Sequence, residues 1–85
     1  DLHVQPHNCA GPVCTAASVQ LDACITNFII QEWFPYRERS TYYDIVEEPL
    51  EFGVVNSEYE IPDKPGLGVT LNEEGIQRFP CLHVD

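Results

Sequence analysis

The sequence predicts an α/β fold in which a strand, a helix and a second strand follow one another in the first half of the chain. Three observations predict it: an alternating apolar segment that ends at Pro6, a one-sided helical pattern that begins at Pro12, and an apolar run at 28–30. This order predicts two parallel strands joined by a right-handed crossover, which is a βαβ unit.

The first strand is expected at 2–6, where Pro6 ends it because proline has no N–H to donate. The helix is expected to run for about four turns from Pro12, since a missing N–H is harmless in the first turn. Its apolar positions recur at helical spacing and are Val13, Ala16, Ala17, Leu21, Cys24 and Ile25. The continuous run within 27–32 is typical of a parallel strand that is covered on both faces.

The second half of the chain predicts less regular structure. Residues 36–46 predict a loop with one helical turn, and 50–55 with 58–61 predict a β-hairpin around Asn56-Ser57. Residues 62–68 have the composition of a turn. Asn72 is expected to cap a short helix that has Glu73 and Glu74 in its first turn.

The net charge of −10 over 85 residues excludes several classes of partner. A nucleic-acid-binding protein needs a basic surface to replace phosphate counterions, and an anionic membrane surface would repel this chain. No apolar run is long enough to cross a bilayer. We therefore expect neither a nucleic-acid partner nor a membrane partner.

The chain begins at Asp1 and contains no methionine, so we expect it to be a fragment of a longer protein. Cys14 and Cys24 are ten residues apart on the expected helix and point to different faces. We expect reduced thiols and a cytoplasmic location, with two disulfides as the alternative.

His7 and Glu32 follow the two expected strands directly. Ligands of parallel α/β folds bind at the carboxyl ends of strands, and both side chains should emerge at one edge. A histidine can exchange a proton near neutral pH, and a carboxyl group can hold a substrate oxygen. The alternative is that His7 caps the loop and Glu32 is merely solvated.

A zinc site is a weaker hypothesis. His3, His7, Cys9 and Cys14 include metal-binding residue types, but there is no Cys-x-x-Cys and His3 lies inside the expected strand. We do not expect a structural zinc site. The aromatic residues that begin at Trp33 are expected either to wall a pocket or to pack under the C-terminal segment.

Several sequence blocks, in this order along the chain, resemble a known family. They are Pro6-His7-Asn8, Gly11-Pro12-Val13 with the alanine-rich helix, 27–32, 62–69 and 71–74. Together they resemble the last barrel strands and the C-terminal signature of the mandelate racemase group of the enolase superfamily. Within that group they are most similar to acid-sugar dehydratases of the D-galactonate dehydratase type.

The resemblance implies a modified (β/α) TIM-type barrel with an α+β capping domain. Residues 1–44 would be the last strand-helix-strand part of the barrel, and 45–85 would return to the capping domain. It implies that His7 is a general base, that Glu32 hydrogen-bonds the substrate carboxylate, and that Asn8 and Trp33 lie in the substrate pocket. It also implies a Mg²⁺ ion whose ligands lie outside this chain.

The expected function is therefore the C-terminal part of a Mg²⁺-dependent sugar-acid dehydratase, whose full-length parent is a homo-oligomer. The 85 residues alone should be inactive, because a complete barrel needs about 250 residues. A racemase or epimerase on the same scaffold is one alternative. A small acidic binding module without catalysis is the other.

Overall fold

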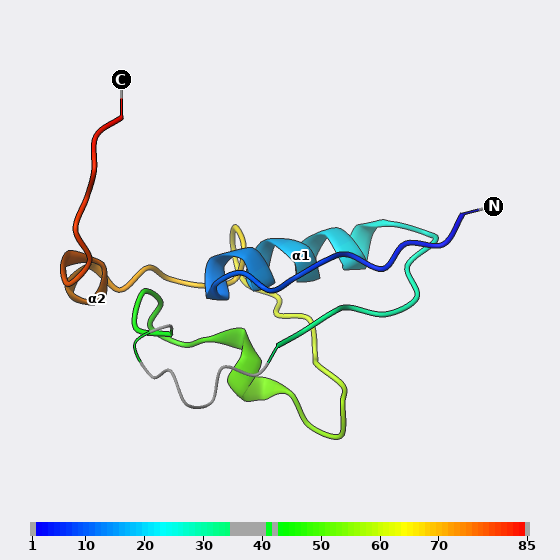
Figure 1. Ribbon diagram of the computed structural model, residues 1–85. Coiled ribbons are helices and arrows are strands. Elements are labelled where there is room, and N and C mark those ends of the chain that lie inside the picture. The colour runs from blue at the N-terminus through cyan, green and yellow to red at the C-terminus, as the bar shows by residue number, and fades with distance from the viewer. Residues whose placement is uncertain (1, 35–40, 42, 85) are drawn as a thin grey trace.

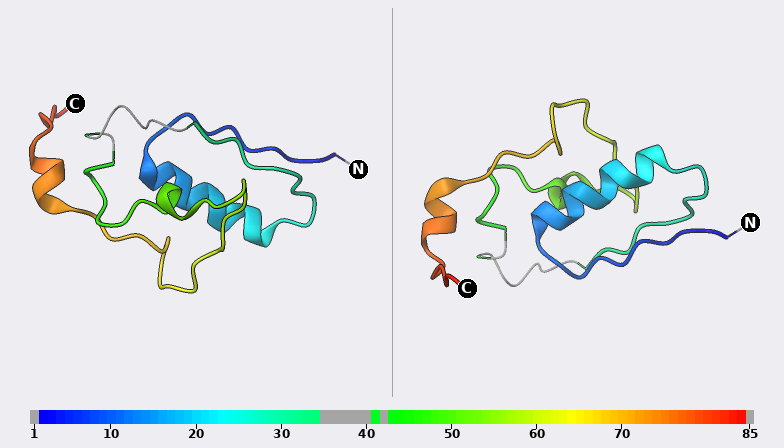
Figure 2. Two further views of the ribbon diagram at one scale, coloured as in Figure 1. Left: turned by 90° about the horizontal axis from the view of Figure 1, so that it is seen from below. Right: turned by 90° about the horizontal axis from the view of Figure 1, so that it is seen from above.

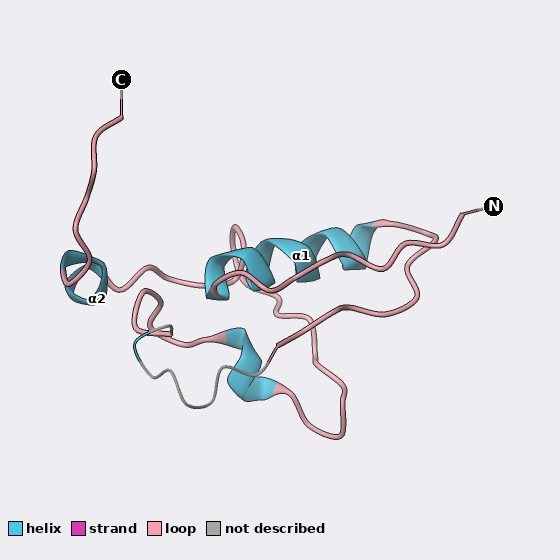
Figure 3. Ribbon diagram, in the orientation of Figure 1, coloured by secondary structure: helices cyan, strands magenta, loops and turns pink. Residues whose placement is uncertain are grey.

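The computed structural model describes residues 2–34, 41 and 43–84, and helices are its regular elements (Figure 1). They are the α-helix α1, Pro12–Cys24, the 3₁₀ helix η2, Leu50–Gly53, and the α-helix α2, Glu73–Gln77. Extended segments and turns connect them. The described residues form isolated β-bridges but no β-strand (Figure 3). None of the described helices is long and apolar enough to span a membrane.

Helix α1 begins where the sequence predicts it. Gly11 is the extended N-cap residue and Pro12 occupies the first turn, where no N–H is required. The helix ends at Cys24, after which Ile25 is extended and its N–H donates to the Leu21 carbonyl at 3.1 Å. One side of α1 packs against η2.

Two extended segments, 2–8 and 27–32, lie side by side along α1 (Figure 2). A single parallel bridge pairs Val4 with Phe28. The Val4 N–H donates to the Asn27 carbonyl at 2.9 Å, and the Ile29 N–H donates to the Val4 carbonyl at 3.1 Å. The parallel direction agrees with the expected strand, helix, strand order, but the full strands of a βαβ unit are not formed in the described residues. Two strands without further neighbours are marginal in water.

The expected burial of the second strand on both faces is wrong for this chain. Phe28, Ile29 and Ile30 are 38%, 58% and 56% exposed. The described residues place no second layer over this run. A run of this composition is typical of a strand between two layers, so its exposure marks a surface that lacks its neighbours.

The expected hairpin is replaced in part by helix. Residues 50–53 form η2 instead of a strand, and they bury Leu50 and Glu51. The turn itself lies where the sequence predicts it: Val55 and Glu58 exchange two backbone hydrogen bonds of 2.9 Å. Asn56 and Ser57 have φ values of 51° and 62°, which is the conformation of a type I′ turn.

The C-terminal part crosses back over residues 43–47. Val46 pairs with Leu71 in an antiparallel bridge, and the Asn72 N–H donates to the Ile45 carbonyl at 2.8 Å. Asn72 then caps α2 as predicted, because its side chain accepts a hydrogen bond from the Gly75 N–H at 3.4 Å. Of the loop expected at 36–46, residues 36–40 and 42 lie outside the described residues.

The core is small and joins the two halves of the chain. Its buried apolar residues are Ala16 of α1, Leu50 of η2, and Tyr43 and Val46 between them. The Tyr43 ring is tilted against Phe52, with 5.0 Å between the ring centroids. These contacts hold α1 against the second half of the chain.

Candidate functional site

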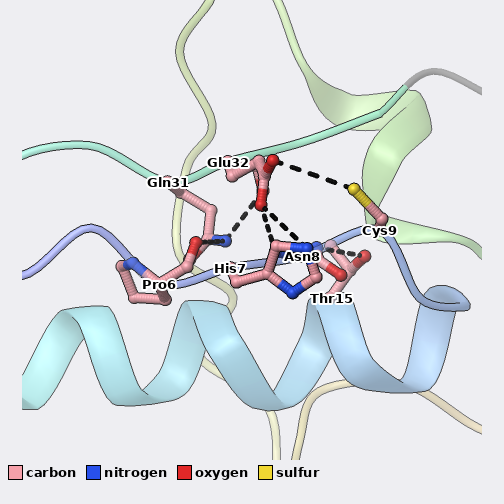
Figure 4. Close-up of polar contacts among 7 residues, drawn as sticks. All are labelled: Pro6, His7, Asn8, Cys9, Thr15, Gln31 and Glu32. Atoms are coloured by element: carbon pink, nitrogen blue, oxygen red, sulfur yellow. Dashed lines mark hydrogen bonds and ion pairs between the residues drawn. The ribbon is translucent and has the colours of Figure 1, made fainter.

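The structure brings His7 and Glu32 together (Figure 4). Both residues follow the paired residues Val4 and Phe28, so the parallel alignment carries both side chains to one end of the pair. The Nε2 atom of His7 lies 3.7 Å from Oε2 of Glu32. The His7 side chain is 82% exposed and that of Glu32 is 37% exposed. A small molecule can therefore reach both groups from solvent.

The carboxylate of Glu32 is oriented by the loop that follows His7. The backbone N–H of Asn8 donates to Glu32 Oε2 at 2.7 Å, and the Cys9 thiol approaches Oε1 at 3.8 Å. Gln31 joins the same two segments, since its side-chain amide donates to the Pro6 carbonyl at 3.2 Å and to the Glu32 carbonyl at 2.8 Å. These bonds hold the His7 segment and the Glu32 segment in register.

Asn8 connects the site to helix α1. Its side chain is 2% exposed, and its amide donates to the hydroxyl of Thr15 in α1 at 2.9 Å. Thr15 is itself buried. In this structure the part of Asn8 that contacts the site is its backbone N–H, whereas its side chain fastens the loop to α1.

Trp33 follows Glu32 directly in the sequence. It lines a cavity of about 660 Å³ together with Tyr43, Glu51 and Phe52. Its place in the substrate pocket, which the resemblance implies, stays a prediction.

Cys9 is a member of the site that the sequence analysis did not place there. Partial desolvation, followed by the negative charge and hydrogen bond of Glu32, raises the pKa of its thiol. His7 and Cys9 are two residues apart, and in an extended segment such residues point to the same side. This spacing is the signal in the sequence that could have placed Cys9 beside His7.

One ligand atom from each of His7, Cys9 and Glu32 lies within 4.8 Å of the other two, a spacing that could hold a metal ion. Magnesium does not fit this set, because it prefers oxygen ligands in octahedral geometry and the cluster offers one carboxylate beside a nitrogen and a sulfur.

The sequence matches a family model described as Enolase C-terminal domain-like over residues 1–75. It is 38% identical over 76 residues to the D-xylonate dehydratase of Haloferax volcanii, an alignment that covers 89% of this chain and 18% of that protein. It is 34% identical over 77 residues to the D-gluconate/D-galactonate dehydratase of Picrophilus torridus, covering 86% of this chain and 18% of the relative.

A third relative is the D-galactonate dehydratase of Xanthomonas campestris pv. campestris. It is 32% identical over 81 residues, which are 92% of this chain and 21% of the relative. The chain thus spans about a fifth of the length of the curated relatives it matches. No solved structure gave a significant match.

Proposed function

Because the chain belongs to the Enolase C-terminal domain-like family, we propose that it is the C-terminal part of a sugar-acid dehydratase. The three relatives are named for D-xylonate, D-gluconate and D-galactonate, which are all sugar acids. Family membership also favours this proposal over a small acidic binding module.

The observation that carries the proposal is the approach of His7 Nε2 to Glu32 Oε2 at 3.7 Å on an accessible edge. An imidazole and a carboxyl group so placed can act on neighbouring atoms of one small substrate. The α-carbon and the carboxylate of a sugar acid are such neighbours. The geometry thus supports a base at the α-carbon and a carboxyl group at the substrate carboxylate.

We assign the base role to His7. Its exposed neutral imidazole would accept the α-proton through Nε2, and the C–H electron pair would pass into an enediolate. The C–O bond to the β-hydroxyl then breaks, and that oxygen leaves as water after the His7 imidazolium returns the proton to it. The resulting enol tautomerises to a 2-keto-3-deoxy acid. The Glu32 carboxyl group, 3.7 Å from His7 Nε2, stabilises the imidazolium whenever it is ionised.

Glu32 is assigned to the substrate carboxylate. A carboxyl group donates a hydrogen bond only when it carries a proton, so this role needs protonated Glu32 in the substrate complex. One of its oxygens is already held by the Asn8 N–H at 2.7 Å. That bond fixes the carboxyl group, and the substrate would take the place of the Cys9 thiol, which approaches the other oxygen, Oε1, at 3.8 Å. A Mg²⁺ ion would add stabilisation of the enediolate when it is bound, through ligands that would lie outside these residues.

The test uses the protein that carries this chain, incubated with D-xylonate, D-gluconate and D-galactonate, and an assay for 2-keto-3-deoxy acids. His7→Asn should lower kcat by about 10²–10⁴-fold, because that is the usual contribution of a general base. It should also abolish exchange of the α-proton with deuterated water. His3→Asn, on the same exposed segment but outside the cluster, is the matched control.

Glu32→Gln should lower kcat while some α-proton exchange remains, since the base is intact. If the parent protein accumulates an epimer of the sugar acid and no keto acid, its reaction is racemisation or epimerisation and not dehydration. If the His7→Asn variant dehydrates the sugar acid at the normal rate, His7 is not the general base.

A further inference from the structure

We propose that His7, Cys9 and Glu32 form a binding site for a thiophilic divalent cation such as Zn²⁺, and that the bound cation inhibits the dehydratase. The site is distinct from a magnesium site in its ligand chemistry. The binding claim stands on the geometry of this chain alone, whereas the inhibition claim rests on the proposed function.

The separations of the ligand atoms suit a small tetrahedral cation. Zinc is bound at about 2.0–2.1 Å by histidine nitrogen and about 2.3 Å by cysteine sulfur, so two ligand atoms in a tetrahedral site lie roughly 3.4–3.7 Å apart. The structure has 3.7 Å from His7 Nε2 to Glu32 Oε2, and 3.8 Å from Cys9 Sγ to Glu32 Oε1. Small side-chain rotations are therefore sufficient to bring the ligands to bonding distance.

The mixture of ligands selects the kind of metal. A nitrogen, a sulfur and a carboxylate oxygen suit Zn²⁺ and related transition metals, whereas magnesium and calcium prefer oxygen alone. Three protein ligands leave the fourth tetrahedral position for water or a substrate oxygen. When the cation binds, a metal–sulfur bond forms and the Cys9 thiol proton passes to solvent.

The surroundings of Glu32 favour such a site. The Asn8 N–H holds one carboxylate oxygen at 2.7 Å, and hydrogen bonds of this kind orient metal ligands in proteins. Asn8 is in turn fastened to Thr15 of α1 at 2.9 Å. The carboxylate is therefore already aimed toward His7 and Cys9 before any cation arrives.

Inhibition follows from the electron pair on His7. The Nε2 atom that would accept the substrate α-proton lies 3.7 Å from Oε2 of Glu32, so it would be one of the ligands of the cation. A nitrogen lone pair that is bound to a metal cannot accept a proton. A cation bound at this site would therefore block both His7 as the base and the carboxyl group of Glu32.

The binding experiment titrates the purified protein that carries this chain with Zn²⁺ in competition with a colorimetric chelator. Cys9→Ser should weaken zinc binding by at least about tenfold, because even indirect support of a ligand is usually worth 10–100-fold. Cys24→Ser removes an exposed thiol at the end of α1, outside the cluster, and should leave the affinity unchanged. Co²⁺ should give a sulfur-to-cobalt charge-transfer band that Cys9→Ser lacks.

The activity experiment measures turnover of the preferred sugar acid with increasing Zn²⁺ at constant Mg²⁺. Inhibition of Cys9→Ser, relative to its own zinc-free rate, should require at least about tenfold more zinc than inhibition of Cys24→Ser. Equal zinc affinity in the two variants, or cobalt spectra without a thiolate band, would overturn the site. Cysteine-dependent zinc binding in a protein with no turnover of sugar acids would instead reject the proposed function and leave the site standing.

Discussion

Nε2 of His7 and Oε2 of Glu32 lie 3.7 Å apart although the two residues are far apart along the chain, at positions 7 and 32. The Val4–Phe28 bridge sets this relationship, because parallel segments that pair at one point end at the same edge. The hydrogen bond from the Asn8 N–H then fixes the carboxylate. The alignment of the two backbone segments therefore brings His7 and Glu32 together. Single substitutions can test each contact around this pair.

Glu32→Gln should make Cys9 more reactive. The charge and hydrogen bond of Glu32 both raise the pKa of the Cys9 thiol, so their removal lowers that pKa and increases the thiolate fraction below it. The rate of Cys9 alkylation by iodoacetamide at pH 8 should rise at least about twofold. Peptide mass spectrometry gives the rate at each thiol. Cys24 is the internal control, and an equal increase at both thiols would contradict the prediction.

Asp22→Asn should stabilise the protein at neutral pH. Desolvation raises the pKa of the Asp22 carboxyl group, and its Oδ1 atom has no hydrogen-bond partner among the described residues. Because the folded state holds this proton more tightly than the unfolded state, Asp22 favours folding at low pH, and that contribution is lost as the pH rises through the raised pKa.

Urea unfolding should therefore show a higher free energy of unfolding for Asp22→Asn than for the parent at pH 7, and a much smaller difference near pH 3. Asp63→Asn, at an exposed position, is the control. The interpretation fails when the stability difference is the same at both pH values.

Thr15→Val should loosen the loop beneath the site. The substitution removes the hydroxyl that accepts a hydrogen bond from the buried Asn8 amide at 2.9 Å, and leaves that amide unpaired. We expect a loss of about 1–3 kcal/mol in the free energy of unfolding. Thr26→Val, at an exposed position, should change the stability by less than about 0.5 kcal/mol. Equal effects of the two substitutions would show that the Asn8–Thr15 bond contributes nothing specific.

Gly75→Ala should disturb the contact between α2 and residues 43–47. A Cβ atom at this position would collide with the backbone carbonyl of Asp44, which cannot move aside as a side chain can. We expect a loss of about 1–3 kcal/mol, the usual result of overpacking. Gln77→Ala tests an exposed position of the same helix. Thermal unfolding in which Gly75→Ala matches the parent would contradict the close approach.

The parts of the fold that local chemistry specifies agree with the sequence analysis. Pro12 begins α1, Asn72 caps α2, and Asn56-Ser57 forms the turn, because each depends on the conformation or the hydrogen bonds of a few neighbouring residues. The prediction of a strand at residues 50–53 was wrong. Leu50 and Glu51 are buried beside α1 in a 3₁₀ turn, so packing overrode the β-propensity of this segment.

The amino-acid order was enough to locate the helix, its cap residues and the two side chains at the ends of the extended segments, since these are local properties of the chain. It could not show that Cys9 joins His7 and Glu32, or that Trp33 lines a cavity together with Tyr43 and Phe52. Those facts depend on how segments distant in sequence align and pack, and hydrophobic pattern constrains that alignment without defining the atoms that meet. The tertiary structure therefore decides that His7, Cys9 and Glu32 form one cluster, although the sequence alone had identified His7 and Glu32 as candidate site residues.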